Sequence, residues 1–177
     1  LAGSGHKIES VLLLENRVSG VPQLLAGLSP SVPVYIASQD VIDAIPGFHL
    51  HRGILAMAAR RPEPGLENLL AALPLDALVV VLSAISNHDN MGSIFRNAAA
   101  FGVNAVILDQ QCCDPLYRKS IRVSVGGVLK VPFAKAVDLE SLCSALSENG
   151  YALAALSPQG EFTVDSLPRM GKRALIL

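Results

Sequence analysis

Residues 77–83 most strongly constrain what this chain can fold into, because all of them up to the closing Ser83 are apolar. A short continuous apolar run of this kind is typical of a strand buried on both faces of a parallel sheet. Parallel neighbours need crossover connections, so helices should lie between such strands. The wider apolar stretch, residues 66–85, is interrupted by Glu67, Asn68, Pro74 and Asp76 and therefore predicts no membrane span.

Periodicity along the rest of the chain alternates between short apolar runs and helical spacing, which predicts an α/β fold with a largely parallel sheet. We predict strands at residues 8–14, 32–37, 54–59, 77–83, 104–108, 128–133, 151–156 and 173–177. We predict helices at residues 21–28, 38–45, 66–73, 92–101 and 139–148, with a long loop or short helix over residues 109–124.

Length and composition bound the domain organisation. The 177 residues are 51% hydrophobic and 16% charged, which is enough apolar material for one large domain or two small ones. Residues 60–65 are rich in proline and charge. We therefore predict a first domain at 1–61, a linker at 62–65 and a second domain at 66–177. Ligands of open parallel sheets bind beyond the carboxyl ends of the strands, which directs attention to residues 84–91, 109–124 and 157–160.

Charge is balanced overall but clustered locally. The net charge of −1 excludes a protein that is basic all over. Residues 115–137 nevertheless hold five lysines and arginines and no carboxylate. A second group lies between Asp43 and Glu63 and comprises His49, His51, Arg52, Arg60 and Arg61. Two such groups favour binding of a polyanion, and the alternative is two solvated charged faces.

The cysteines suggest no metal knuckle and no disulfide framework. Cys112 and Cys113 are adjacent and Cys143 is distant. Three unpaired thiols suit a reducing cytosol, and the first residues lack the pattern of a secretory signal. We therefore expect a cytoplasmic protein without a structural metal.

Residues 86–102 are the most informative segment. On a helix that starts near Met91, an inward face would hold Met91, Ile94, Phe95, Ala98 and Phe101. Arg96 would then point outward, about one turn into the helix and near the carboxyl edge of the sheet. A guanidinium there can hold a phosphate with two hydrogen bonds. The alternatives are a surface pair of Arg96 with Asp89, and a helix-capping role for Asn90. His88 in the same loop is a weak candidate base.

The combination of motifs, in this order, resembles a known family. Asn90-x-Gly92-x-x-x-Arg96-x-Ala98-x-x-Phe101-Gly102, followed by Arg122-x-Ser124-x-Gly126, is similar to the SpoU (TrmH-like) branch of the SPOUT RNA methyltransferases. These enzymes transfer a methyl group from S-adenosylmethionine to a ribose 2′-hydroxyl. The upstream His51-Arg52-Gly53-Ile54-x-Ala56 is similar to the end of the family's small substrate-binding domain.

The resemblance implies a fold and roles for particular residues. It implies a small ribosomal-protein-like α/β domain that binds RNA, followed by a trefoil-knot-type SPOUT domain. Arg96 and Asn90 match the catalytic motif, and Ala155, Leu156 and Ser157 match the strand end that lines the cofactor pocket. The residues that the resemblance and the cationic groups assign to RNA are His51, Arg52, Arg118, Lys119, Arg122 and Ser124. Because a guanidinium keeps its charge, Arg96 is better suited to orient the hydroxyl than to accept its proton.

The sequence also departs from the family. In the family, a strand like residues 173–177 continues into a Gly-x-Glu-Gly loop, and a later Ser/Asn-rich segment closes the knot. Neither is present here. We therefore expect a SPOUT domain that lacks its final knot segment, a first domain clipped at its start, and a chain that by itself binds the cofactor poorly and is inactive.

Two functional hypotheses remain open at this point. The first is a 2′-O-ribose methyltransferase that acts on tRNA or rRNA as a homodimer, with S-adenosylmethionine as methyl donor. The second is a non-catalytic RNA-binding module on the same scaffold. A third, a nucleotide-binding enzyme of another kind, is disfavoured because no strand end carries a Gly-x-Gly-x-x-Gly or Walker loop.

Overall fold

The computed structural model describes residues 4–45, 53–167 and 170–177. The chain divides into two compact units, Leu1–Arg61 and Pro62–Leu177. The division falls immediately before residues 62–65, the predicted linker. Every helix in the described part of the chain is too short or too polar to cross a lipid bilayer.

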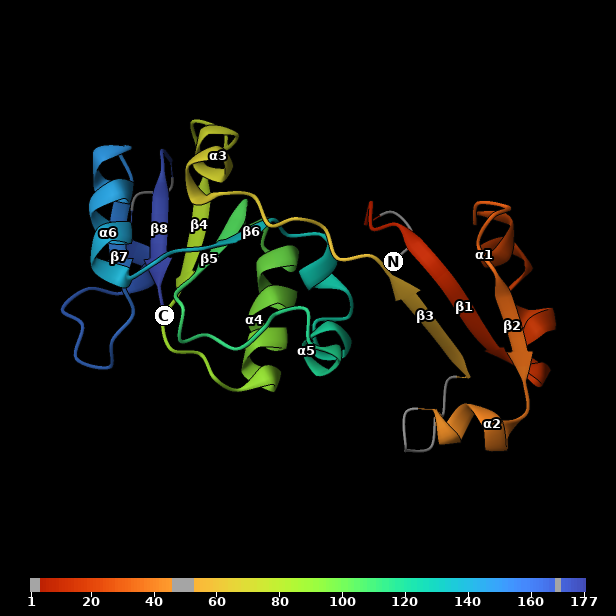
Figure 1. Ribbon diagram of the computed structural model, residues 1–177. Helices are drawn as coiled ribbons and strands as arrows, with labels where there is room; N and C mark the ends of the chain where they lie inside the picture. The colour runs from red at the N-terminus through yellow and green to blue at the C-terminus, as the bar shows by residue number, and fades with distance from the viewer. Residues whose placement is uncertain (1–3, 46–52, 168–169) are drawn as a thin grey trace. The chain divides into compact units, whose positions relative to one another are not determined.

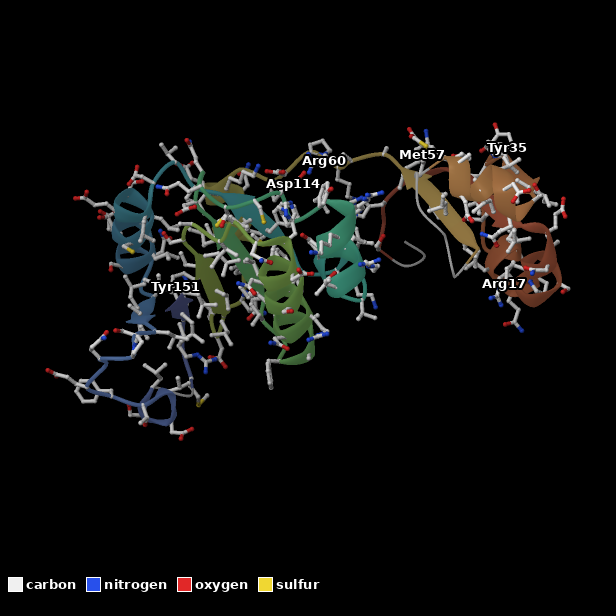
Figure 2. The ribbon with its side chains drawn as sticks, turned by 90° about the horizontal axis from the view of Figure 1, so that it is seen from below. Arg17, Tyr35, Met57, Arg60, Asp114 and Tyr151 are labelled. Carbon is white, nitrogen blue, oxygen red and sulfur yellow. The ribbon has the colours of Figure 1, made fainter. Side chains whose placement is uncertain are left out.

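The first unit is a three-stranded mixed sheet with short helices. β1 is central, parallel to β2 and antiparallel to β3. Its core includes Val11 and Leu13 of β1 and Ile42 of the second helix. Figure 2 shows Tyr35 and Met57 projecting from the same side of this sheet, and both are exposed. The elements are β1 (Ile8–Leu14), η1 (Glu15–Gly20), α1 (Pro22–Ala26), β2 (Val34–Ala37), α2 (Gln39–Ala44) and β3 (Ile54–Ala58).

The second unit is a five-stranded sheet in the order β6-β5-β4-β8-β7, and every neighbouring pair is parallel. The α/β fold class and the largely parallel sheet predicted from the sequence are therefore confirmed. The strands are β4 (Leu78–Leu82), β5 (Ala105–Leu108), β6 (Phe133–Lys135), β7 (Ala152–Ala155) and β8 (Arg173–Ile176). The helices are α3 (Leu66–Ala71), α4 (His88–Ala100), α5 (Arg118–Val123), η2 (Gly127–Leu129), α6 (Leu139–Glu148) and η3 (Val164–Ser166).

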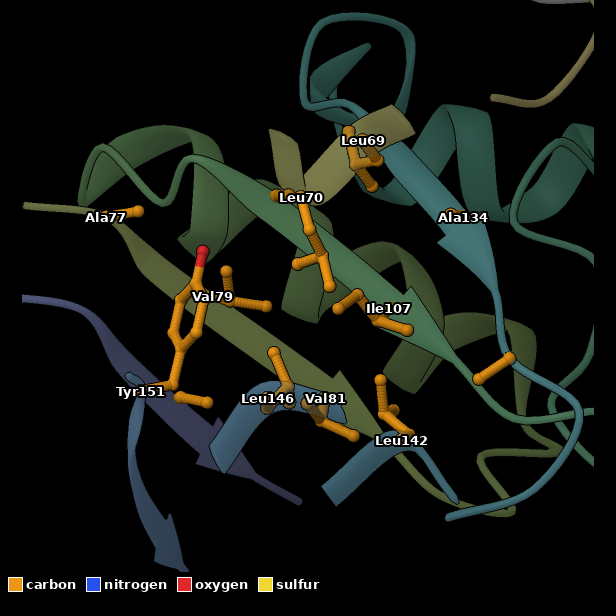
Figure 3. Close-up of a cluster of buried hydrophobic side chains, with 13 residues drawn as sticks. Leu69, Leu70, Ala77, Val79, Val81, Ile107, Ala134, Leu142, Leu146 and Tyr151 are labelled. Atoms are coloured by element: carbon orange, nitrogen blue, oxygen red, sulfur yellow. The ribbon is translucent and has the colours of Figure 1, made fainter. Parts of the chain in front are cut away.

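Helices cover both faces of this sheet. This covering is expected because β4 has apolar side chains on both faces, which must be shielded from water. α6 lies on one side of the sheet and α4 and α5 lie on the other (Figure 1). On one face, Val79 and Val81 of β4 pack in a cluster of buried hydrophobic side chains with Leu142 and Leu146 of α6 (Figure 3). Val80 and Leu82 alternate to the opposite face, where they join Phe95 of α4.

Three predictions about secondary structure and burial are wrong. Residues 128–133 form no continuous strand: η2 occupies the start, and β6 begins only at Phe133. Pro132 has no N–H to donate to a ladder, and its carbonyl accepts from the amide of Val106. The buried Val128 and Val131 pack with α4 instead, which explains the apolar pattern.

The second and third corrections concern α4. The helix begins at His88, several residues before the predicted start. Phe101 lies beyond its last residue, as the C-cap, and is 79% exposed instead of facing the core. Met91, Phe95 and Ala98 are buried as predicted, so the helical spacing itself is correct.

Candidate functional site

The loop from β4 to α4 leaves the carboxyl edge of the parallel sheet. Asn87 caps α4, because its side-chain Oδ1 accepts from the amides of Asp89 at 2.7 Å and Asn90 at 3.2 Å. Asn90 is thus a residue of the first helical turn and not the cap, which overturns the capping alternative. Its side chain is exposed.

Arg96 is exposed on α4, as predicted. It is eight residues beyond His88, which places it about 12 Å along the helix axis, farther from the sheet edge than predicted. The alternative pair with Asp89 does not form, since Asp89 Oδ2 accepts from Lys119 Nζ at 2.6 Å. Within the described residues, the Arg96 guanidinium has no ion-pair partner.

Two glycines bring α5 and η2 against the part of α4 that carries Arg96. A Cβ on Gly92 would lie 2.7 Å from Val123 Cβ and 2.8 Å from the carbonyl oxygen of Ser120. A Cβ on Gly127 would lie 2.8 Å from the carbonyl oxygen of Phe95 and 3.3 Å from Arg96 Cα. Only glycine permits this approach, so the motif glycine at position 92 has a packing role.

The cations of α5 lie on its exposed side. Arg118, Lys119 and Arg122 are all exposed. Ser124 is different: it is 2% exposed, and its hydroxyl donates to the carbonyl oxygen of Ile121 at 2.9 Å. The expected direct contact of Ser124 with RNA does not fit this placement. Ser124 closes the turn after α5.

The residues predicted to line the cofactor pocket are the last residue of the edge strand β7 and the two that follow it. Ala155, Leu156 and Ser157 are exposed, and Leu156 donates its amide to the carbonyl oxygen of Ile176 at 2.9 Å. β8 lies between β7 and β4, so the structure does not place these residues directly beside the strand that leads to α4. The predicted RNA-binding residues His51 and Arg52 lie outside the described residues. His88 packs its ring against Tyr117, with centroids 4.4 Å apart.

One buried carboxylate, at the start of the segment 109–124 singled out from the sequence, received no role in the sequence analysis. Asp109 follows β5 directly and is 6% exposed. Burial would raise its pKa, but hydrogen bonds from Ser83, Cys112, Ala84 and Gln111 outweigh burial and hold the pKa below its ordinary value. Its position in the sequence could have indicated a role, because it is an acidic residue directly at the carboxyl end of an apolar strand.

Comparison with known proteins adds to this geometry. Residues 77–177, more than half of the chain, match the SpoU rRNA Methylase family. The chain belongs to this family. The matched residues hold all five strands of the parallel sheet and its covering helices from α4 onward, whereas α3 precedes the match.

Curated relatives support the same assignment. An uncharacterized tRNA/rRNA methyltransferase of Mycobacterium tuberculosis is 43% identical over 146 residues, which cover 82% of this chain and 49% of the relative. One from Mycobacterium avium is 31% identical over 130 residues, which cover 71% of this chain and 41% of the relative. The chain therefore spans about half the length or less of these curated relatives.

Solved structures share the fold across nearly the whole chain. The SpoU methyltransferase AviRb from Streptomyces viridochromogenes, in complex with the cofactor AdoMet, has a TM-score of 0.81 at 17% identity, covering 99% of this chain and 67% of that one. A structure described as an RNA 2′-O ribose methyltransferase has a TM-score of 0.77 at 22% identity, covering 99% and 66%. The chain thus has the SPOUT methyltransferase fold.

Proposed function

We propose that this chain is part of an S-adenosylmethionine-dependent methyltransferase that modifies ribose 2′-hydroxyls of tRNA or rRNA. Membership of the SpoU family supports methyl transfer to RNA, and curated relatives carry tRNA/rRNA methyltransferase names. A structural neighbour is described as a 2′-O ribose methyltransferase, which favours the ribose oxygen as acceptor.

The exposed guanidinium of Arg96 is the observation that carries the proposal. Among the described residues no carboxylate pairs with it, and Asp89, its nearest candidate in the sequence, is taken by Lys119. α5, which packs on α4, adds the exposed Arg122. Cations presented together without neutralising carboxylates provide the local positive surface that an RNA backbone requires.

The role of Arg96 follows from guanidinium chemistry. Its N–H groups lie in a rigid fork that matches two phosphate oxygens, so it fixes the orientation of a bound nucleotide. It keeps its charge and therefore cannot accept the proton of the 2′-hydroxyl. Asn90, six residues before Arg96 on the same helix, supplies an exposed amide as a further donor or acceptor. Catalysis by these residues would come mainly from orientation.

Residues at the end of β7 would line one side of the methionine-adenosine group. Leu156 is 44% exposed and offers apolar surface, while Ala155 adds a small side chain beside it. Pockets for small molecules combine such apolar walls with a few polar groups, and Ser157 supplies a hydroxyl. When bound, S-adenosylmethionine supplies the methyl group as an activated sulfonium. These three residues would hold it at the carboxyl edge of the sheet.

The remaining predictions join this proposal. The first unit would contribute RNA contacts through His51 and Arg52. The protein would act in the cytoplasm as a homodimer, in which Arg96 of one subunit approaches the cofactor of the other. Measuring the mass of the intact protein in solution tests the dimer directly.

Methyl transfer from tritiated S-adenosylmethionine to bulk tRNA and rRNA tests the activity. We expect the intact protein to label RNA at an alkali-resistant linkage, as a 2′-O-methyl group blocks cleavage of the adjacent phosphodiester. Arg96→Ala should lower kcat by about 100-fold, because the orienting group is lost. Arg96→Lys should recover little, since an ammonium lacks the fork.

Asn97→Ala is the matched control, because Asn97 is the exposed neighbour of Arg96 on the same helix and the motif Arg96-x-Ala98 specifies no residue type at its position. We expect its activity to equal that of the wild type. Full activity of Arg96→Ala, or alkali-labile product, would contradict the assignment.

The second candidate, a non-catalytic RNA-binding module, is favoured by the same cationic α5. It predicts salt-dependent RNA binding without methyl transfer by the intact protein. The labelling experiment separates the two candidates.

A further inference from the structure

Asp109 joins the loops that follow two neighbouring strands. Its Oδ2 accepts from Ser83 Oγ at 2.7 Å and from the amide of Ala84 at 2.9 Å, both in the β4–α4 loop. Its Oδ1 accepts from the amides of Gln111 at 2.9 Å and Cys112 at 3.0 Å, both after β5. One carboxylate thus holds both loops at the carboxyl edge of the sheet.

All four groups donate a hydrogen bond to Asp109, and backbone amides lie on both sides of it. Both oxygens of the side chain must therefore act as acceptors. A deprotonated carboxylate has four acceptor positions and meets this requirement. An asparagine in the same place has one carbonyl oxygen and one NH2 group. The NH2 would turn toward Ser83, whose hydroxyl can accept as well as donate, and the amide of Ala84 on that side would lose its acceptor.

Ala84 is the strained residue in this arrangement. Its φ is +55°, in the left-handed region that residues with a Cβ rarely adopt. Its amide is one of the two groups in the β4–α4 loop that Asp109 holds. Strain of this type persists where the surroundings impose it, and it sets the direction in which the loop leaves β4.

Further bonds continue from this point to the start of α4. The amide of Cys113 donates to the carbonyl oxygen of Ile85 at 2.8 Å. Ser120 Oγ donates to the carbonyl oxygen of His88 at 3.2 Å. The strained turn at Ala84 and the first turn of α4 are therefore both attached to residues 109–120.

We infer that Asp109 is a positioning residue for methyl transfer: it holds Ala84 in its left-handed conformation and so fixes where α4 presents Asn90 and Arg96. This inference rests on the proposed function, because the activity that it tunes is the RNA methylation proposed above. Asp109 is buried and touches no substrate in this account, and its effect passes through the loop.

Asp109→Asn in the intact protein tests the inference. We expect kcat for RNA methylation to fall by about tenfold or more, because small displacements of orienting groups are costly, while the Kd for RNA changes by less than about threefold. Hydrogen exchange should accelerate in residues 83–91 and remain slow in β4. Ser83→Ala, which removes one of the four donors, should produce a smaller change of the same kind.

The informative variant is the double substitution Asp109→Asn with Ala84→Gly. Glycine adopts positive φ without the steric cost, so the loop can take its direction without the carboxylate. We expect the double variant to regain kcat to within about threefold of Ala84→Gly alone. A role in stability alone would leave kcat of the double variant at the level of Asp109→Asn.

Asp76→Asn is the matched control. Asp76 precedes β4 at the opposite edge of the sheet and pairs with Arg173 at 3.2 Å, so its loss should leave kcat unchanged. Unaltered kcat in Asp109→Asn, an equal fall in Asp76→Asn, or no rescue by Ala84→Gly would each overturn the inference while the wild type still methylates RNA. A wild type that transfers no methyl group would overturn the proposed function, and this inference with it.

Discussion

Two buried polar side chains in the second unit illustrate how the fold treats such groups at the scale of single residues. Asp109 is charged and fully hydrogen-bonded, so its burial is compensated. Tyr151 is also buried, and its hydroxyl has no hydrogen-bond partner in the described part of the chain. Burial accordingly raises the pKa of Tyr151. The first residue organises loops, whereas the second carries an uncompensated cost.

Tyr151→Phe should therefore stabilise the protein. Removing a buried hydroxyl without a partner eliminates its desolvation cost and keeps the ring packed among Val79 and Leu146. We expect the free energy of unfolding to rise by about 1 kcal/mol in denaturant titrations. Tyr117→Phe is the control, because Tyr117 is 45% exposed and its change should stay within about 0.5 kcal/mol. A loss of stability in Tyr151→Phe would show that the hydroxyl has a partner.

At the scale of secondary-structure elements, side-chain caps define where the long helices begin. Asn87 caps α4 through its Oδ1, and Asp138 caps α6 by accepting from the amide of Ser141 at 2.7 Å. Ser141 Oγ donates to the second carboxylate oxygen of Asp138 at 2.8 Å. Both caps satisfy amides that have no partner within the helix.

The cap of α6 gives stability that depends on pH. Hydrogen bonds from Ser141 lower the pKa of Asp138 from its ordinary value of 3.8. Because the pKa of Asp138 is lower in the folded than in the unfolded protein, its carboxylate stabilises the fold fully at pH values above the unfolded-state pKa. This stabilisation is lost as the pH falls through the folded-state pKa. Asp138→Ala should thus be less stable than the wild type at pH 7, and the difference should shrink below pH 3.8.

Thermal unfolding measured across this pH range checks the prediction. Glu148→Ala removes a carboxylate from the other end of α6, where the helix dipole disfavours negative charge, so it should not lower stability at neutral pH. A difference between Asp138→Ala and the wild type that stays constant down to acid pH would contradict the assigned role of the carboxylate.

At the scale of the whole molecule, clustered cations in a chain of net charge −1 predict RNA binding that depends on salt. Affinity of the intact protein for RNA should fall steeply between about 0.05 and 0.2 M salt. Arg122→Ala should reduce the slope of log affinity against log salt by about one, since one phosphate contact is lost.

Filter binding over a salt series measures this slope. Lys172 is a suitable control, because it precedes β8 at the edge of the sheet opposite the site and donates to the carbonyl oxygen of Asn149 at 3.1 Å. Lys172→Ala should leave the slope unchanged. Equal slopes for Arg122→Ala and the wild type would show that Arg122 of α5 makes no phosphate contact with RNA.

Sequence alone determined the features that local spacing encodes. The apolar run at residues 77–83 specified a doubly covered parallel strand, and helical periodicity specified that Phe95 is buried and Arg96 exposed. Spaced motif residues pointed to the family that residues 77–177 match. Each of these signals lies within a short window, where the period of the backbone decides which side chains share a face.

Tertiary structure decided what depends on residues far apart in the chain. Asp109 bonds Ser83 across 26 positions, and Ser120 bonds the carbonyl oxygen of His88 across 32, which together attach the β4–α4 loop and the first turn of α4 to the segment after β5. Gly127 packs against the backbone of Phe95, so the segment after it turns along α4 instead of forming a strand. No local period encodes these approaches, because their hydrogen bonds and close contacts exist only once the sheet has brought the loops together.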